Sequence, residues 1–134
     1  VAAELLRRNT VLPTHAVAFA AFESLARRHR DLDLYRLLRV REPDRVLRLS
    51  ELHEAVGRLS AALARRAASG QLRLASELRI PEPEEIVADA LRHFGIYHTR
   101  PVLTRRGDRL YPEDMNLLFY YHNRLTSYGL EREL

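Results

Sequence analysis

Apolar positions along the chain recur mainly at the three- and four-residue spacing of an α-helix. The clearest stripe has four members, which are Leu52, Val56, Leu59 and Leu63. Ser50 precedes this stripe as a suitable N-cap residue, and Gly70 follows it where a helix would stop. The pattern therefore predicts the longest helix of the chain over residues 51–69.

Residues 14–30 predict a second helix with a different pattern. Its segment 16–22 is apolar on all sides, and a helix that is apolar all round is normally buried. Thr14 is the expected N-cap residue, and Arg27 and Arg28 lie in the last turn, where cations suit the helix dipole. An apolar helix beside basic residues can also lie in a membrane interface. We favour burial and keep membrane contact as an alternative.

The other elements are shorter and separated by turn residues. In the first half of the chain we expect a helical stub at 2–8, a short helix capped by Asp31 or Asp33 and ending at Leu38, and an extended or irregular link over 40–49. A short strand is expected within 71–75, followed by a helix that opens with the acidic cluster Glu82, Glu84 and Glu85 and stops at Gly95. Residues 96–111 predict a hairpin-like segment that turns at Arg106, Gly107 and Asp108. Together these elements predict a mostly α fold: one compact helical domain with one or two small hairpin-like strand pairs.

The last helical segment is unusually rich in aromatic residues. Five of the ten aromatic residues lie between Tyr111 and Tyr128. Pro112 is expected at the first turn of this helix, and Gly129 at its end. Tyrosine carries a large apolar ring and a hydroxyl that needs a partner, so the segment predicts a packed, hydrogen-bonded seam.

Polar residues inside this aromatic segment are candidates for a site. His122, Asn123 and Arg124 are expected to act at an interface or to bind an anion, because a guanidinium can hold a phosphate or carboxylate through two hydrogen bonds. We favour the alternative that Arg124 holds this last helix against the acidic cluster at Glu82–Glu85. Arg27 and Arg28 are the second candidate pair for an interface or an anion.

Composition excludes several kinds of chemistry. The 134 residues are 46% hydrophobic and 30% charged, as in an ordinary folded domain. Without cysteine, the chain can form no disulfide, thiol nucleophile or cysteine-based zinc site. None of the six histidines is followed five residues later by an aspartate, and none belongs to a recognisable metal pattern. We therefore expect no metal, no cofactor and no catalytic residue within this chain.

Charge leaves two further possibilities open. All 22 basic residues are arginine, and the net charge of +4 would suit an anionic partner such as a membrane surface. The order of helices and strands also resembles a winged-helix nucleic-acid-binding module, with Ser50–Ala68 as recognition helix and Leu72–Ile80 in a wing. Glu51 and Glu54 would repel phosphates at the leading end of that helix, so nucleic acid is the less favoured partner.

Several segments carry a resemblance to a known family. The segment Asn9–Phe19, with the sequence NTVLPTHAVAF, resembles the region that follows the catalytic domain in bacterial glycerol-phosphate acyltransferases. Gly95–His98 (GIYH), Tyr120–Leu125 (YYHNRL) and Tyr128–Leu130 (YGL) are similar to the C-terminal end of the same proteins. The resemblance covers nearly the whole chain, from about Asn9 to Leu130.

The resemblance implies transfer of a fatty acyl group to a glycerol phosphate hydroxyl in phospholipid synthesis. In that family a His and an Asp five residues apart deprotonate the hydroxyl, and a Glu-Gly-Thr-Arg-like segment helps to bind the phosphate; this sequence has neither motif. Residues 1–134 are therefore expected to be one non-catalytic C-terminal accessory domain of a longer enzyme. Its expected partner is the upstream catalytic domain, and its expected location is cytoplasmic or peripheral on the inner face of the membrane. Val1 as first residue and Met115 as sole methionine agree with a fragment.

Overall fold

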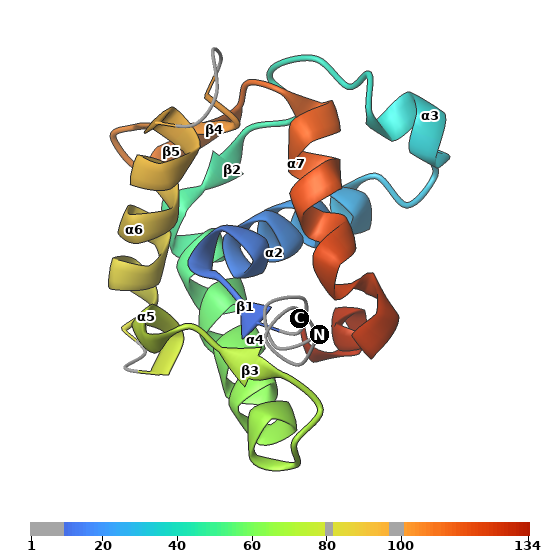
Figure 1. Cartoon of the computed structure of the whole chain (residues 1–134). Helices are drawn as coiled ribbons and strands as arrows, with labels where there is room; N and C mark the ends of the chain where they lie inside the picture. Colours follow the sequence, from blue (N-terminus) through green and yellow to red (C-terminus); the bar gives the residue numbers. More distant parts are fainter. Residues whose placement is uncertain (1–9, 80–81, 97–100) are drawn as a thin grey trace.

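A computed structural model describes residues 10–79, 82–96 and 101–134 (Figure 1). Helices dominate, and the strands are short. The elements are β1 Thr10–Val11, α2 Pro13–Arg28, α3 Leu34–Leu37, β2 Leu47–Arg48, α4 Leu49–Ala68, β3 Arg73–Leu74, α5 Ser76–Arg79, α6 Pro83–Ile96, β4 Leu103–Arg106, β5 Arg109–Pro112, α7 Met115–His122 and the 3-10 helices η1 Asn123–Tyr128 and η2 Leu130–Glu133. The predicted mostly α fold with small strand pairs is confirmed.

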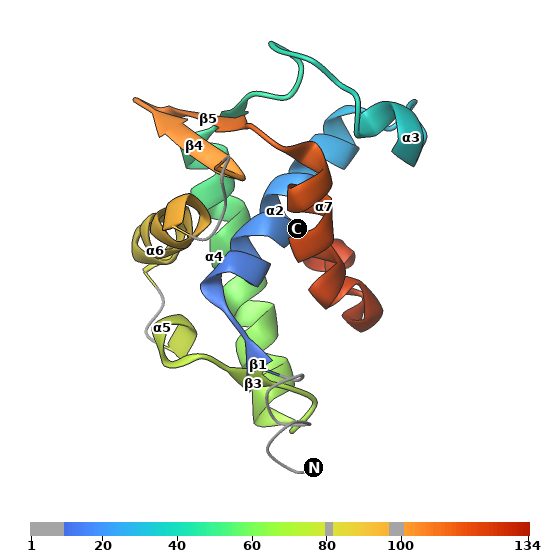
Figure 2. The same ribbon diagram turned by 45° about the horizontal axis from the view of Figure 1, so that its top comes forward.

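Helix α2 forms the centre of the core because its middle segment is apolar all round. Every residue from Ala16 to Ala21 is at most 1% exposed. Helices α4, α6 and α7 all pack against α2, as the views from two directions show (Figures 1 and 2). Burial of α2 is therefore confirmed. Among the described residues no helix is long and apolar enough to cross a membrane.

Two small sheets lie at opposite ends of the helical core (Figures 1 and 2). Strands β1 and β3 pair in parallel at one end, whereas β2, β5 and β4 form a three-stranded antiparallel sheet in that order at the other. The predicted turn of the β4–β5 hairpin is confirmed, with Gly107 at a φ of 63° that favours glycine.

The order of the main elements is helix, strand, helix, helix, strand, strand: α2, β2, α4, α6, β4 and β5. Strand β2 pairs with β5, so the first strand of the three-stranded sheet lies beside its last. The elements differ from those expected for the winged-helix alternative. Residues 72–79 form no wing, because β3 pairs with β1 and is followed by α5.

Three predicted helix starts are wrong, each for a local reason. Helix α2 begins at Pro13 rather than after Thr14, and α4 begins at Leu49 rather than after Ser50. The Leu49 N–H donates to the Asp108 carbonyl at 2.8 Å, so strand β2 runs directly into α4 without a side-chain cap. Pro112 closes β5, and α7 begins instead behind Asp114, whose carboxylate accepts from the Leu117 N–H at 3.0 Å. The predicted stub at 2–8 lies outside the described residues.

Candidate functional site

The aromatic seam predicted near the end of the chain lies between α2 and α7. His122 is its central residue, and its side chain is 6% exposed. The ring stacks on Phe19 at a centroid distance of 4.9 Å and an interplanar angle of 9°. Phe22 and Phe119 contact it at centroid distances of 4.6 and 5.6 Å. The structure therefore places His122 at an internal helix–helix interface.

His122 is hydrogen-bonded to a carboxylate from the opposite helix. Its Nε2 lies 2.8 Å from Oε1 of Glu23. A carboxylate can only accept, so Nε2 donates and the bond fixes one orientation of the ring. A buried His–carboxylate pair resembles the acid–base pair of many enzymes. Here, however, three phenylalanine rings surround the imidazole, so a substrate cannot reach it without opening the core.

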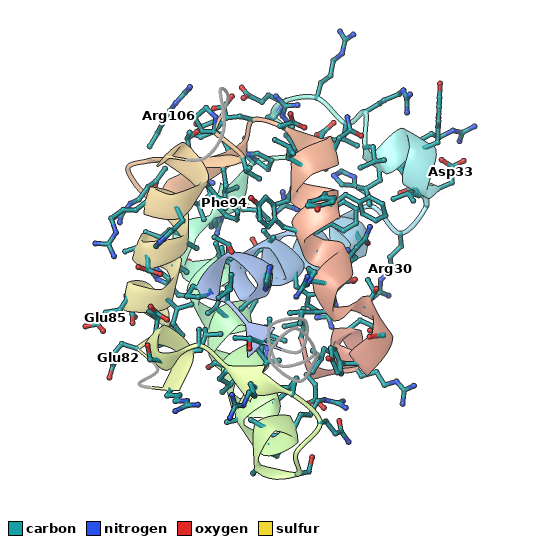
Figure 3. The ribbon with its side chains drawn as sticks, in the orientation of Figure 1. Arg30, Asp33, Glu82, Glu85, Phe94 and Arg106 are labelled. Carbon is teal, nitrogen blue, oxygen red and sulfur yellow. The ribbon has the colours of Figure 1, made fainter. Side chains whose placement is uncertain are left out.

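Asn123 and Arg124 extend this seam toward the surface. Asn123 Oδ1 lies 3.2 Å from Nδ1 of His122, and the residue is otherwise exposed. Arg124 is exposed and lines a hollow of about 410 Å³ with Thr10, Leu12 and His15. The structure thus places Arg124 beside the start of α2. Glu82 and Glu85 project outward at the beginning of α6 (Figure 3).

His15, in the same hollow, is a cap of α2 that we did not predict. The Leu12 N–H donates to its Nδ1 at 3.1 Å, as it would to a glutamate in a capping box. Nδ1 must be unprotonated to accept this bond. Burial, with the Arg124 charge as the second cause, lowers the pKa of His15 to about 4. His15 is therefore a neutral structural residue at pH 7.

Arg27 and Arg28 make internal contacts at the end of α2. Arg27 Nη2 donates to the Glu131 carbonyl in η2 at 2.9 Å. Arg28 Nη1 donates to the Val46 carbonyl at 2.6 Å, and its Nη2 lies 3.2 Å from Oε2 of Glu51. These contacts connect α2 to the end of the chain, to the segment before β2 and to α4.

An apolar groove with a volume of about 590 Å³ runs along one face of α4. Small residues of α4 form one wall, namely Gly57, Ser60, Ala61, Ala64 and Ala67. Leu72, Leu74 and Leu78 of the β3–α5 segment lie along the groove, with Arg73 and Arg79 also among its lining residues. This groove is a surface that a neighbouring apolar chain could fill.

Sequence patterns missed Glu23, which lies 99 residues from its partner His122. The only signal was an acidic side chain within a helix that is otherwise apolar on that stretch. No protein-family model matches this chain, and no curated protein or solved structure matches it at a significant level.

Proposed function

We propose that this chain is the non-catalytic C-terminal domain of an enzyme that resembles glycerol-phosphate acyltransferases. In this proposal an upstream domain transfers the acyl group during phospholipid synthesis, and the present domain braces it. The internal use of His122 and His15 supports a structural role, because neither imidazole is available to deprotonate a hydroxyl. The protein would work in the cytoplasm or peripherally on the inner face of the membrane.

The groove on α4 is the observation that carries the bracing role. Its lining is mostly apolar, and Ala61 and Ala64 remain exposed there. Strand β1 pairs with β3, which lines the groove, so Thr10, the first residue that the structure describes, lies opposite a residue of the groove. An upstream domain of the same chain is therefore the occupant that we propose.

The first test is the coding sequence upstream of Val1. We expect a His and an Asp five residues apart, followed by a Glu-Gly-Thr segment. Their absence would remove the acyltransferase assignment. Purified residues 1–134 should transfer no acyl group from an acyl-CoA thioester to glycerol 3-phosphate, and activity of this chain alone would overturn the non-catalytic role.

The second test changes the groove in the longer protein. Ala64→Glu places a charge in the groove and should lower both acyl transfer and the thermal stability of the upstream domain. Ala88→Glu is the matched control, because Ala88 is exposed on α6 and does not line the groove. Equal behaviour of the two variants would exclude the groove as the docking surface.

Membrane contact is the second candidate, and one observation favours it. Leu34 and Tyr35 on α3 are 46% and 65% exposed, and the Arg39 guanidinium lies 3.5 Å from the centroid of the Tyr35 ring. Apolar side chains beside cations suit an anionic lipid surface. Co-sedimentation with anionic vesicles should be lost in Leu34→Ser/Tyr35→Ser. It should persist in Tyr120→Ser, whose side chain is equally exposed on α7, and loss in both would point to general hydrophobicity.

The acidic outer surface of α6 disfavours nucleic acid. Glu84 and Glu85 are exposed on α6, the helix that precedes the β4–β5 hairpin, and Asp89 is partly exposed. Carboxylates at these positions would repel DNA phosphates. Steeply salt-dependent binding to duplex DNA would contradict this argument.

A further inference from the structure

Three arginines lie opposite one another across the three-stranded sheet. The register pairs Arg48 of β2 with Arg109 of β5, and Arg109 with Arg106 of β4. Their sheet neighbours Leu47 and Leu110 are fully buried, so alternation along the strands directs the three arginines to the outer face. Like charges at directly opposed positions destabilise a sheet.

Two of these arginines line a polar hollow with a volume of about 540 Å³. Arg48 and Arg109 meet Arg28 and Tyr111 there. The Arg28 guanidinium is held in place by the Val46 carbonyl and by Glu51. Arg106 extends the basic face, with its guanidinium 4.7 Å from the centroid of the Tyr111 ring, and projects outward at this end of the molecule (Figure 3).

Carboxylates lie close to some of these arginines and not to others. Glu51 pairs with Arg28 at 3.2 Å, and Glu113 lies 3.7 Å from Arg106 while also accepting from Thr104. Asp108 lies 3.8 Å from Nε of Arg109 but is 89% exposed, so solvent weakens that contact.

Among the described residues that line the hollow, Glu42 is the only carboxylate, whereas three residues are arginines. The side chain of Arg48 has no hydrogen bond or ion pair with any residue that the structure describes. The hollow therefore keeps at least one uncompensated cation.

We propose that this hollow binds a phosphate group. Guanidinium forks hold phosphate oxygens through paired hydrogen bonds, and a dianion offsets the repulsion between Arg48 and Arg109. The hydroxyl of Tyr111 is a further donor on the same face. Arginines from α2, β2 and β5 offer more donors than a single carboxylate needs. The site is independent of the bracing role, which requires no anion.

The test is a titration of residues 1–134 with inorganic phosphate at low ionic strength, followed by the ¹H–¹⁵N signals of the arginine side chains. We expect saturable shifts of Arg28, Arg48 and Arg109. Arg48→Gln and Arg109→Gln should each weaken the affinity about tenfold. The control Arg58→Gln, on the exposed face of α4, should leave the affinity unchanged. Shifts spread evenly over all exposed arginines, or unaffected by Arg48→Gln and Arg109→Gln, would overturn the proposal.

Two further arms identify the source of the phosphate group. Binding of glycerol phosphate, without binding to vesicles, would assign the hollow to a small solute. Sedimentation with phosphatidic acid vesicles but not with phosphatidylcholine vesicles, abolished by Arg48→Gln, would assign it to a lipid headgroup. Absence of binding in every arm would refute the site. Far-ultraviolet circular dichroism of each variant verifies that the fold is kept.

Discussion

The seam between α2 and α7 differs from the outer face of the three-stranded sheet in whether its polar side chains have partners within the protein. In the seam, His122 is buried and its Nε2 is matched by a carboxylate at 2.8 Å. On the sheet, the side chain of Arg48 is exposed, lies opposite Arg109 and makes no hydrogen bond or ion pair with a described residue. A buried polar group that has a partner stabilises a fold, whereas a cation directly opposite another cation in a sheet costs stability.

This difference separates structural residues from candidates for binding. The aromatic seam is the more conspicuous feature of the sequence, yet its polar atoms are hydrogen-bonded to one another. The sheet face is inconspicuous in the sequence, yet it leaves donors facing solvent. To locate a ligand site, it is therefore more informative to ask whether a polar side chain already has a partner in the folded chain than to ask which residue type it is.

The largest expected effect comes from removing the centre of the seam. His122→Ala leaves a cavity among the rings that contact it and deprives Glu23 of its partner. We expect the free energy of unfolding to fall by about 4 kcal/mol. Urea unfolding at pH 7, followed by circular dichroism, measures the loss.

Asn116→Ala is the matched control for this change. Asn116 is exposed on α7, and its replacement should alter stability by no more than about 0.5 kcal/mol. If both variants unfolded at similar urea concentrations, the seam would not be the tightly packed element that its geometry indicates.

His15 sharpens the comparison, because it is a buried polar group with a cation as neighbour. An unfolded histidine takes up a proton near pH 6.5, whereas the lowered pKa of His15 delays this to about 4 in the folded chain. At a pH between about 4 and 6.5, His15 therefore takes up a proton when the chain unfolds. His15 should lower the free energy of unfolding by about 3 kcal/mol as pH falls from above 6.5 to below 4.

His15→Gln isolates this contribution from other titrating groups. A glutamine oxygen can still accept from the Leu12 N–H, but it does not titrate. Urea unfolding at several pH values should show that wild type loses more stability on acidification than the variant does. Parallel curves would mean that His15 does not carry the pH dependence.

Local patterns predicted the helices and the hairpin turn but not the pairing between them. The stripe of α4 is buried as expected, with Leu59 and Leu63 fully inaccessible, because its spacing is set within one element. Pro112 was predicted in the first turn of a helix because proline is common there. It fits the end of β5 because β2 pairs only with Arg109 and Leu110, which leaves Pro112 without a neighbour on that side.

The two most informative contacts both lie beyond what a local pattern can specify. Glu23 meets His122 across 99 residues. The arginine row depends on the register of strands that are two and four residues long. Such short strands carry too few alternating positions to fix their register from sequence.

The smallest expected effect has the opposite sign from the first. Arg48→Thr removes one of two directly opposed cations and introduces a residue that favours strands, so it should stabilise the chain by about 0.5 kcal/mol at low ionic strength. Arg73→Thr is the matched control, because Arg73 lies opposite Thr10 and not opposite a cation, so this change gains only the strand-propensity difference. The gain of Arg48→Thr over this control should shrink in about 1 M salt, where charges are screened within about 3 Å. Saturating phosphate should erase it too, because a bound dianion would stabilise the wild-type pair instead. A gain that was independent of both salt and phosphate would come from strand propensity alone, and the contrast between the matched seam and the unmatched sheet face would then be wrong.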